Sequence, residues 1–298
     1  MILVDFNHTV ISTLMAQMGP KEVENFTEEN VSLLRHMVFN CLRSYRQKFG
    51  QEFGELVICT DSRSWRKDVF QHYKAHRNSE RQVSKIDWGL IFDTLHQILI
   101  DIRTYFPYIV ISVEKAEADD VIAVLCELSQ QSGGENMFGS EAEPVLILSG
   151  DKDFQQLQKY SNVKQWATVQ KKWIKPKDWK LQLRELIVQG DKGDGIPNFR
   201  SPGDTFVNHI RQKKVMKNKL KEYLTKDPKD FCTDQELVWF KRNEELIDFT
   251  YIPESVRIAI QQEYASQCKL NTGKNRMTIM SYFMKHRMKN MIELAGDF

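Results

Sequence analysis

The sequence predicts an α/β fold with a mostly parallel central sheet of about five strands. Short runs that are apolar along their whole length alternate with segments of helical periodicity, which is typical of a parallel sheet covered by helices on both faces. The predicted strands lie in MILVD (1–5), LVICTD (56–61), YIVISV (108–113) and VLILSGDKD (145–153), with a further strand near 163–166.

Helical segments fill the intervals between these strands. HTVISTLMAQM (8–18) is stopped by Gly19 and Pro20, and Thr27 caps a longer helix whose apolar positions keep helical spacing. Residues 87–106 and 117–128 are also expected to be helical, and everything beyond residue 177 is predicted to be helical and basic. We therefore expect an α/β core over 1–176 and a smaller helical region over 177–298.

Composition bounds the possible classes of protein. The 298 residues, 41% hydrophobic and 28% charged, can bury a large core. No apolar stretch approaches 18 residues and the N-terminus lacks a basic region, which argues against a membrane span or a secretory signal. The five cysteines are scattered and odd in number, as expected of reduced thiols in a cytoplasmic protein, and a zinc site is not expected.

Acidic residues gather where the predicted strands end. In parallel sheets these ends share one edge, so the acids should converge there. Two unit charges about 4 Å apart repel by roughly 4 kcal/mol at an effective dielectric near 20, so such crowding does not stabilise a fold by itself. Divalent cations with oxygen ligands would remove the penalty, and Mg²⁺ suits such ligands. The predicted metal ligands are Asp5, Asp61, Glu117, Asp119, Asp120, Asp151, Asp153, Asp191 and Asp194.

The most specific of these motifs is GDKGDGIP (190–197). Its glycines allow tight turns whose backbone N–H groups can receive phosphate, and its two acids are three residues apart. A single Asp after a strand, such as Asp5 or Asp61, is by contrast common in any strand-to-loop turn.

The net charge of +2 hides a strong segregation. Basic residues dominate 63–85, 164–184 and 211–230. Any one of these segments alone would be interpreted as the solvent-exposed face of a lysine-rich helix. Together with an acidic centre, they suit a polyanion that is held by the flanks and attacked at the centre.

The order D, D, EADD, SGDKD and GDxxDxIP resembles the family of 5′-nucleases that includes flap endonucleases and the 5′-exonuclease domain of bacterial DNA polymerase I. The similarity runs over nearly the whole chain and is greatest to bacteriophage members that remove lagging-strand primers. It implies a PIN-like sheet, a helical arch at 62–86 and a helix-turn-helix-type motif that grips duplex DNA.

The resemblance also implies roles for individual residues. Asp5, Asp61, Glu117, Asp119 and Asp151 would surround a first Mg²⁺, and Asp120, Asp153, Asp191 and Asp194 would serve a second, with Mn²⁺ as a substitute. In the arch, Tyr73, Lys74 and Arg77 match a motif that contacts the scissile phosphate, and Arg66 and Lys67 would bind DNA.

Two departures from the family pattern bear on binding, one on the binding of DNA and the other on the binding of a replication clamp. The glycines and lysine that usually follow GDxxDxIP are missing, so Lys192, Arg200 and Arg211 are expected to substitute for them, with Lys213, Lys214 and Lys217 gripping the duplex. RMTIMSYF (276–283) resembles a clamp-binding box without its glutamine, and Ile279, Tyr282 and Phe283 are instead expected to be helix core.

The expected function is Mg²⁺-dependent 5′-3′ exonuclease and flap endonuclease activity on forked, flapped or nicked duplex DNA and on RNA–DNA hybrid. The expected enzyme is a monomer in the cytoplasm of a host cell, with a replication clamp and a single-strand DNA-binding protein as candidate partners. Two alternatives are a PIN-type endoribonuclease, which would normally lack the arch, and a DNA-binding scaffold, which need not keep the acids. A haloacid-dehalogenase-like phosphatase would need Asp-x-Asp where this chain has Asp5-Phe-Asn7.

Overall fold

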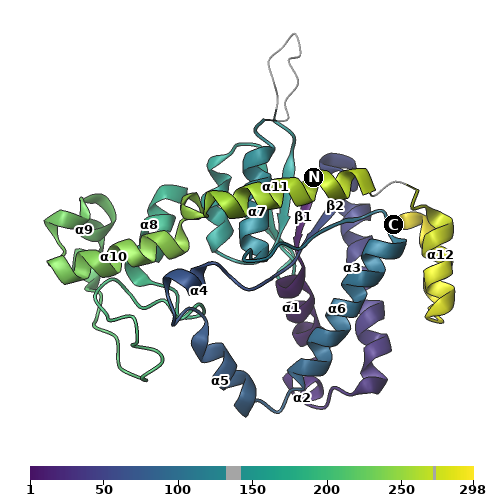
Figure 1. Cartoon of the computed structure of the whole chain (residues 1–298), viewed down its shortest axis with the longest axis horizontal. Coiled ribbons are helices and arrows are strands. Elements are labelled where there is room, and N and C mark those ends of the chain that lie inside the picture. The colour runs from purple at the N-terminus through teal and green to yellow at the C-terminus, as the bar shows by residue number, and fades with distance from the viewer. Residues whose placement is uncertain (132–141, 271–272) are drawn as a thin grey trace, which may run out of the picture.

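The computed structural model describes residues 1–131, 142–270 and 273–298, and its centre is a six-stranded sheet in the order β3-β2-β1-β4-β5-β6 (Figure 1). All neighbouring strands pair in parallel except β5 and β6. The predicted mostly parallel sheet is confirmed. The sixth strand was missed because it is short, basic and largely exposed. The strands are β1 (Ile2–Asp5), β2 (Leu56–Cys59), β3 (Ile109–Ile111), β4 (Val145–Leu148), β5 (Val163–Ala167) and β6 (Lys172–Ile174).

Alternate residues of each strand point to opposite faces of the sheet, so apolar runs build two cores. Ile2 and Val4 of β1 belong to one core, and Leu3 belongs to the other. Fully burying one such side chain contributes roughly 1.5–3 kcal/mol. The first core lies under α1 (Phe6–Met18), α3 (Glu28–Phe53), α6 (Trp88–Tyr105) and α12 (Arg276–Lys285), and the second under α7 (Ala118–Leu128), η1 (Asp153–Lys159) and α11 (Glu254–Leu270).

Capping residues hold the starts of two helices, and the cap at Thr27 is as predicted. Thr27 and Asn30 form a capping box at α3, and the side chain of Asp87 accepts the Leu90 N–H at α6. Helix α1 ends at Gly19, whose φ of +80° lies in the region that favours glycine. A short helix α2 (Pro20–Val23) follows, because proline is well tolerated in the first turn of a helix.

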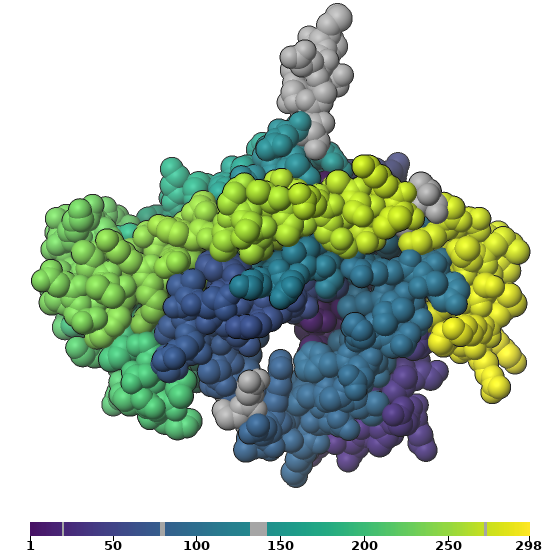
Figure 2. All heavy atoms as spheres, viewed as in Figure 1, coloured from purple at the N-terminus to yellow at the C-terminus, as the bar shows by residue number. Residues whose placement is uncertain are grey.

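The predicted arch, residues 62–86, contains α4 (Arg66–Val69) and α5 (Ala75–Val83). Figure 2 shows an opening through the molecule that is bordered by the dark-blue arch and the blue α6. The first half of the arch is anchored by buried aromatic side chains, because Trp65, Phe70 and Tyr73 are all less than 9% exposed. Helix α5 has no buried side chain among those described.

The C-terminal region is less regular than predicted. Helix α8 (Trp179–Gln189) is followed by an irregular segment, 190–216, and then by η2 (Lys217–Lys219), α9 (Leu220–Thr225), η3 (Pro228–Asp230) and α10 (Asp234–Ile247). Continuous helix was the wrong expectation over 190–216, because its glycines, prolines and β-bridge favour turns. These helices form a third core that also takes in Phe70 and Tyr73 of the arch.

The chain then returns to the sheet domain. After η4 (Phe249–Tyr251), α11 covers the second core, and α12, α13 (Lys289–Ile292) and η5 (Ala295–Asp297) close the first. Ile279, Tyr282 and Phe283 are buried, as expected of helix core. A division at residue 176 stays a prediction, since side chains from Phe249 onward complete both cores of the sheet. No helix among the described residues is long and apolar enough to cross a membrane.

Candidate functional site

Seven of the predicted acids line one cavity of about 290 Å³ at the carboxyl edge of the sheet. Parallel pairing of β1 with β2 and β4 brings the ends of these strands together, as expected from the order of the motifs. Helix α7 and the 190–197 loop supply the remaining acids. The seven are Asp5, Asp61, Asp119, Asp151, Asp153, Asp191 and Asp194.

Local hydrogen bonds hold the first acids in place. Asp5 is the N-cap of α1 and also accepts a hydrogen bond from Ser149 Oγ at 3.1 Å. Asp61 accepts from Asn7 Nδ2 at 2.9 Å and from the N–H of Ala118 at 3.0 Å. Three segments that are far apart in the sequence therefore meet at Asp61, which connects the end of β2 to the starts of α1 and α7.

The loop after β4 presents two further carboxylates. The Asp153 N–H donates to Asp151 Oδ1 at 3.0 Å, and Gln165 of β5 supports the loop by donating to the Asp151 carbonyl at 2.6 Å. Asp153 Oδ1 is buried and has no hydrogen-bond partner among the described residues. A buried oxygen without a partner costs free energy, so this atom marks a place where a ligand is expected.

The GDKGDGIP loop is a closed turn. Asp191 and Ile196 form a β-bridge, and a Cβ on Gly190 would lie 2.3 Å from the Ile196 carbonyl oxygen, so only glycine fits there. The N–H groups of Gly193 and Gly195 donate within the turn, to Asp191 Oδ1 at 2.7 Å and to the Lys192 carbonyl at 3.1 Å. The prediction that these N–H groups receive phosphate is therefore corrected, because the turn already uses them.

Two cations of the arch reach the acids. Lys74 Nζ lies 2.5 Å from Glu117 Oε1 and 3.6 Å from Asp194 Oδ1, and an Arg77 terminal nitrogen lies 2.7 Å from Asp194 Oδ1. The backbone of Lys74 has a φ of +54°, a left-handed conformation that costs a non-glycine residue roughly 1–3 kcal/mol. A hydrogen bond from its N–H to the Asp194 carbonyl at 2.8 Å holds this conformation.

Tyr73 lies between the same acids. Its hydroxyl is 2.9 Å from Glu117 Oε2 and 2.8 Å from Asp194 Oδ2, and the ring is only 2% exposed. The predicted trio of Tyr73, Lys74 and Arg77 is thus brought together at the acidic cavity. Lys74 and Arg77 line it.

The electrostatics of the cavity reflect crowded, buried carboxylates. Burial, followed by the charges of Asp61 and Asp151, raises the pKa of Asp5 to about 8. Burial and then neighbouring acids also raise the pKa of Asp119 and of Asp153 well above the usual range. The native fold therefore holds these groups at a cost that a bound cation would relieve.

The acidic cavity fits divalent cations in its chemistry. Its donors are carboxylate oxygens, which hard ions such as Mg²⁺ prefer, and they include the unpartnered Asp153 Oδ1. Within the described ranges, however, no three His, Cys, Asp or Glu side chains are grouped closely enough to hold an ion as they lie. Lys74, Arg77 and Lys152 pair with Asp194 or Asp191 instead, so these two acids would have to exchange a cationic side chain for the ion.

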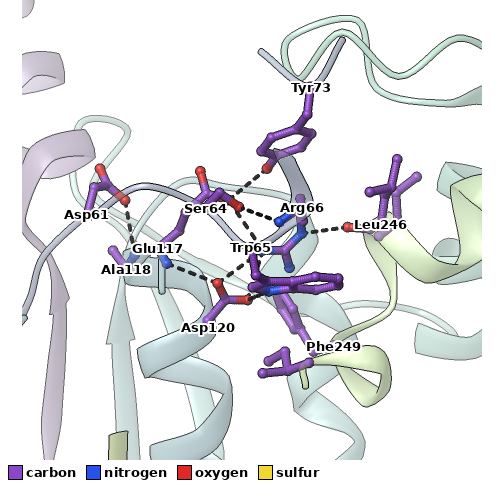
Figure 3. Close-up of polar contacts among 12 residues, drawn as sticks. Asp61, Ser64, Trp65, Arg66, Tyr73, Glu117, Ala118, Asp120, Leu246 and Phe249 are labelled. Atoms are coloured by element: carbon purple, nitrogen blue, oxygen red, sulfur yellow. Dashed lines mark hydrogen bonds and ion pairs between the residues drawn. The ribbon is translucent and has the colours of Figure 1, made fainter. Parts of the chain in front are cut away.

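Asp120 and Arg66 are corrections to the predicted site. Asp120 is fully buried, accepts hydrogen bonds from Arg66 at 2.8 and 3.1 Å, and also accepts from the Trp65 indole (Figure 3). Arg66 is 3% exposed and also donates to the Leu246 carbonyl at 2.8 Å. Neither can serve as predicted, since Arg66 cannot reach a phosphate and Asp120 does not line the cavity.

Glu117 has an intermediate position. Its carboxylate accepts hydrogen bonds from Ser64, Tyr73 and Arg66 on one oxygen and from Lys74 on the other (Figure 3). Burial alone would raise its pKa, but Lys74 and Arg66 outweigh burial and hold the pKa at about 2. Glu117 is ionised at neutral pH. It does not line the cavity itself, but it contacts Lys74, which does, so its role as a metal ligand stays a prediction.

The predicted DNA-binding cations occupy different environments. Lys67 and Lys192 are exposed, which leaves them available to phosphate. Arg200 is instead held by Glu236 at 3.0 Å and by the Lys214 carbonyl, and its expected role in DNA binding stays a prediction. A second cavity, of about 620 Å³, is lined by Arg211, Lys213, Lys214 and Lys217.

Several residues that line the acidic cavity were not predicted from the sequence, and Asn7, Arg81 and Phe92 are among them. Asn7 supports Asp61, and Arg81 and Phe92 line the cavity on the side of the arch and α6. Phe92 could have been found from the sequence, because it is an aromatic residue just outside the row of apolar residues that α6 buries in the core. No signal distinguished Arg81 from the other basic residues of the arch.

Comparison with protein families gives two matches that together span the chain. A model described as 5′-3′ exonuclease, N-terminal resolvase-like domain, matches residues 1–184, and a model described as T4 RNase H, C terminal, matches residues 180–298. Ribonuclease H of Enterobacteria phage T4 is 32% identical over 99% of this chain and 95% of its own length. Flap endonuclease Xni of Shewanella piezotolerans is 31% identical over 59% of this chain and 65% of its own length.

Solved structures share the fold at low sequence identity. A bacteriophage T5 flap endonuclease in a pseudo-enzyme–product complex with DNA and metal ions superposes with a TM-score of 0.59, at 14% identity, over 91% of this chain and 98% of that chain. A T5 5′-exonuclease with bound zinc gives a TM-score of 0.58 at 12% identity, over 91% of this chain and 99% of that chain.

Proposed function

Because this chain belongs to the 5′-3′ exonuclease family and is a nuclease of the phage ribonuclease H type, we propose that it is a Mg²⁺-dependent, structure-specific 5′-nuclease. Its proposed substrates are RNA–DNA hybrid and flapped, forked or nicked duplex DNA, cut near the 5′ end. Its proposed task is the removal of RNA primers in phage lagging-strand replication, in the cytoplasm of the host cell.

The observation that carries this proposal is the meeting of seven carboxylates with Lys74 and Arg77 in one cavity. Asp5, Asp61, Asp119 and Asp151 would hold one ion, and Asp153, Asp191 and Asp194 a second. Two bound ions would supply an activated water and stabilise the leaving 3′ oxygen.

The residues of the chain position the phosphodiester and balance its charge. Lys74 remains protonated at neutral pH: burial lowers its pKa, but Asp194 and Glu117 outweigh burial and raise it. Its ammonium group and the Arg77 guanidinium would stabilise negative charge that develops on the scissile phosphate. Tyr73 would hold the carboxylates of Glu117 and Asp194 next to these cations, because its hydroxyl contacts both of them.

The second cavity supports a grip on the unbroken duplex. Its four exposed cations can hold backbone phosphates, which carry no sequence information, so specificity would be for structure rather than for base sequence. The clamp and the single-strand DNA-binding protein remain proposed partners, and a monomer remains the proposed state.

The proposal is tested with 5′-labelled substrates of matched sequence: a flapped DNA, a nicked DNA and an RNA–DNA hybrid, each with Mg²⁺, with Mn²⁺ and with EDTA. We expect short 5′ products with either metal and none with EDTA. Asp153→Asn should abolish turnover yet keep DNA binding, because exposed lysines supply most of the affinity. Asp234→Asn, a change at an exposed position in the first turn of α10, is the matched control and should cut as the wild type does.

Absence of cleavage with both metals would refute the enzyme and leave the DNA-binding scaffold. Internal cuts in single-stranded RNA without regard to the 5′ end would instead favour a PIN-type endoribonuclease.

A further inference from the structure

One wall of the acidic cavity is not acidic. Helix α6 contributes Phe92 and α5 contributes Arg81, whereas the sheet edge and the 190–197 loop contribute carboxylates. Phe92 is half-buried, and it packs on the first core as well as lining the cavity. An aromatic ring that faces a polar cavity is available to a ligand in a way that a core ring is not.

Phe92 is one of two stacked rings. Trp88 and Phe92 are four residues apart and so lie on the same face of α6, with ring centroids 5.9 Å apart and planes inclined by 27°. The N-cap Asp87, which accepts the Leu90 N–H at 2.9 Å, fixes the first turn of the helix that carries both rings. The rings form a rigid aromatic ledge, because α6 packs on the core through Ile91, Leu95 and other buried residues.

Arg81 lies over this ledge. Its guanidinium carbon is 4.9 Å from the Phe92 centroid and 5.8 Å from the Trp88 centroid. Lys74 and Arg77 are paired with acids, but Arg81 forms no ion pair with any of the described side chains. A guanidinium stacked on a ring keeps its N–H edge free to bind phosphate in two places.

A ring and a free guanidinium match the two parts of one nucleotide. Bases of unpaired strands stack on aromatic side chains without regard to sequence, and the adjoining phosphate binds arginine. A paired base cannot offer its face in this way, because its neighbours in the duplex cover it. The ledge also belongs to α6, which with the arch borders the opening through the molecule (Figure 2).

We infer that Phe92, backed by Trp88 and joined by Arg81, is a binding subsite for one unpaired nucleotide of the 5′ single strand. The base would take the place of the Arg81 guanidinium on the Phe92 ring, and the displaced guanidinium would bind the phosphate of the same nucleotide. This inference rests on the proposed function. The subsite would add affinity only for substrates with an unpaired 5′ segment, and would therefore favour flaps over blunt or nicked ends.

The test measures binding in EDTA, so that no strand is cut. A series of flapped DNAs carries an abasic residue at one unpaired position after another. For the wild type we expect affinity to fall about fivefold to 150-fold at one position, the range expected from the loss of one stacked base. Phe92→Leu keeps the apolar contact with the core but should bind the normal and abasic flaps equally, whereas Phe92→Tyr should keep the discrimination.

Arg81→Gln provides a second variant, at an exposed position whose change does not threaten the fold. It should weaken binding of the flapped DNA and leave binding of a blunt duplex unchanged. Tyr251→Leu, at an aromatic residue 46% exposed in η4, is the matched control and should behave as the wild type in every assay.

Two results would overturn the inference: unchanged discrimination in Phe92→Leu, or equal losses for flap and blunt duplex in Arg81→Gln. If Phe92→Leu does not fold, the Arg81→Gln result decides alone. Failure of the proposed function is distinct, because the wild type would then cut no 5′ end with Mg²⁺. If the wild type cuts and the variants discriminate as it does, only the subsite is refuted.

Discussion

At the scale of single residues, the cavity divides charged side chains into two groups. Lys74 and Arg77 pair with acids that line the cavity, so they can exchange those partners for a phosphate. Arg66 pairs with Asp120, which is fully buried and has no such freedom. The first group is expected to affect catalysis, and the second to affect stability.

Lys74→Ala should lower the single-turnover rate about 10²- to 10³-fold while changing DNA affinity little, because its charge acts on the scissile phosphate. Rates at saturating enzyme, together with binding curves, separate the two effects. Lys67→Ala, an exposed change on the same arch, is the control. If affinity falls and the rate per bound complex does not, Lys74 is only one of many phosphate anchors.

Arg66→Ala should destabilise the fold by about 3–5 kcal/mol, since it leaves Asp120 buried without its cation and removes one of the two cations that contact Glu117. Urea unfolding measures the change in the free energy of unfolding. Arg63→Ala removes a pair with Asp68 that is largely exposed, and it should cost no more than about 1 kcal/mol. Similar losses in the two variants would show that the buried pair does not differ from a surface pair.

His286 should make stability depend on pH. Burial, followed by the Arg35 charge, lowers its pKa, and the centroid of the tilted Tyr282 ring lies 4.4 Å from that of the His286 ring. The unfolded chain therefore binds a proton more readily than the native state, so stability falls as pH drops below about 6.5. Asp101 and Lys285 also act on the ring, with opposite signs. In His286→Gln the free energy of unfolding should depend less on pH between about pH 7 and 5. If its slope against pH is unchanged, His286 is not the source of this pH dependence.

At the scale of elements, the arch and the 190–216 segment differ in how firmly they hold their cationic side chains. The arch holds Tyr73, Lys74 and Arg77 rigidly through the 190–197 loop, whereas the lysines of 213–217 project from an irregular segment with few regular hydrogen bonds. Fixed cations suit a reacting phosphate, and adaptable ones suit a duplex backbone of varied sequence.

Replacing Lys213, Lys214 and Lys217 together by alanine should reduce the salt dependence of duplex binding by up to about three phosphate contacts. Binding measured across a range of salt concentrations gives the slope. A matched triple change of exposed lysines elsewhere, Lys229, Lys241 and Lys269, keeps the same net charge and should leave the slope close to that of the wild type. An equal slope for both triples would place the duplex elsewhere.

At the scale of the whole molecule, the acids oppose folding and the cores favour it. Two faces of apolar side chains hold the sheet, and its carboxyl edge gathers seven carboxylates whose mutual repulsion and burial raise several pKa values. Ligands that bind only the native state stabilise it by mass action.

Millimolar Mg²⁺ should therefore raise the melting temperature, and the rise should grow with the ratio of the Mg²⁺ concentration to its Kd. A concentration one hundred times the Kd would stabilise the native state by about 2.7 kcal/mol. Calorimetry with Mg²⁺ and with EDTA measures the shift. Asp151→Asn should shrink the shift, because it removes a carboxylate of the cavity. A melting temperature indifferent to Mg²⁺ would count against a metal centre here.

The sequence by itself determined the sheet, the helix starts and most of the acidic edge. Apolar runs that need two covered faces specify a parallel sheet, and acids directly after such runs must meet at one edge, so Asp5, Asp61, Asp151 and Asp153 were accessible from local pattern. The capping residue Thr27 acts within one helical turn, and its effect was equally predictable from the local sequence.

Only the tertiary structure decided which charged residues are free. Arg66 and Lys67 are neighbours of like charge, yet Arg66 is buried against Asp120 and Lys67 is exposed, because partners 51 to 54 residues away determine the difference. The ledge of Phe92 and Arg81 joins two helices whose contact no local period encodes. Local spacing specifies elements, whereas burial and pairing of charge depend on long-range contacts.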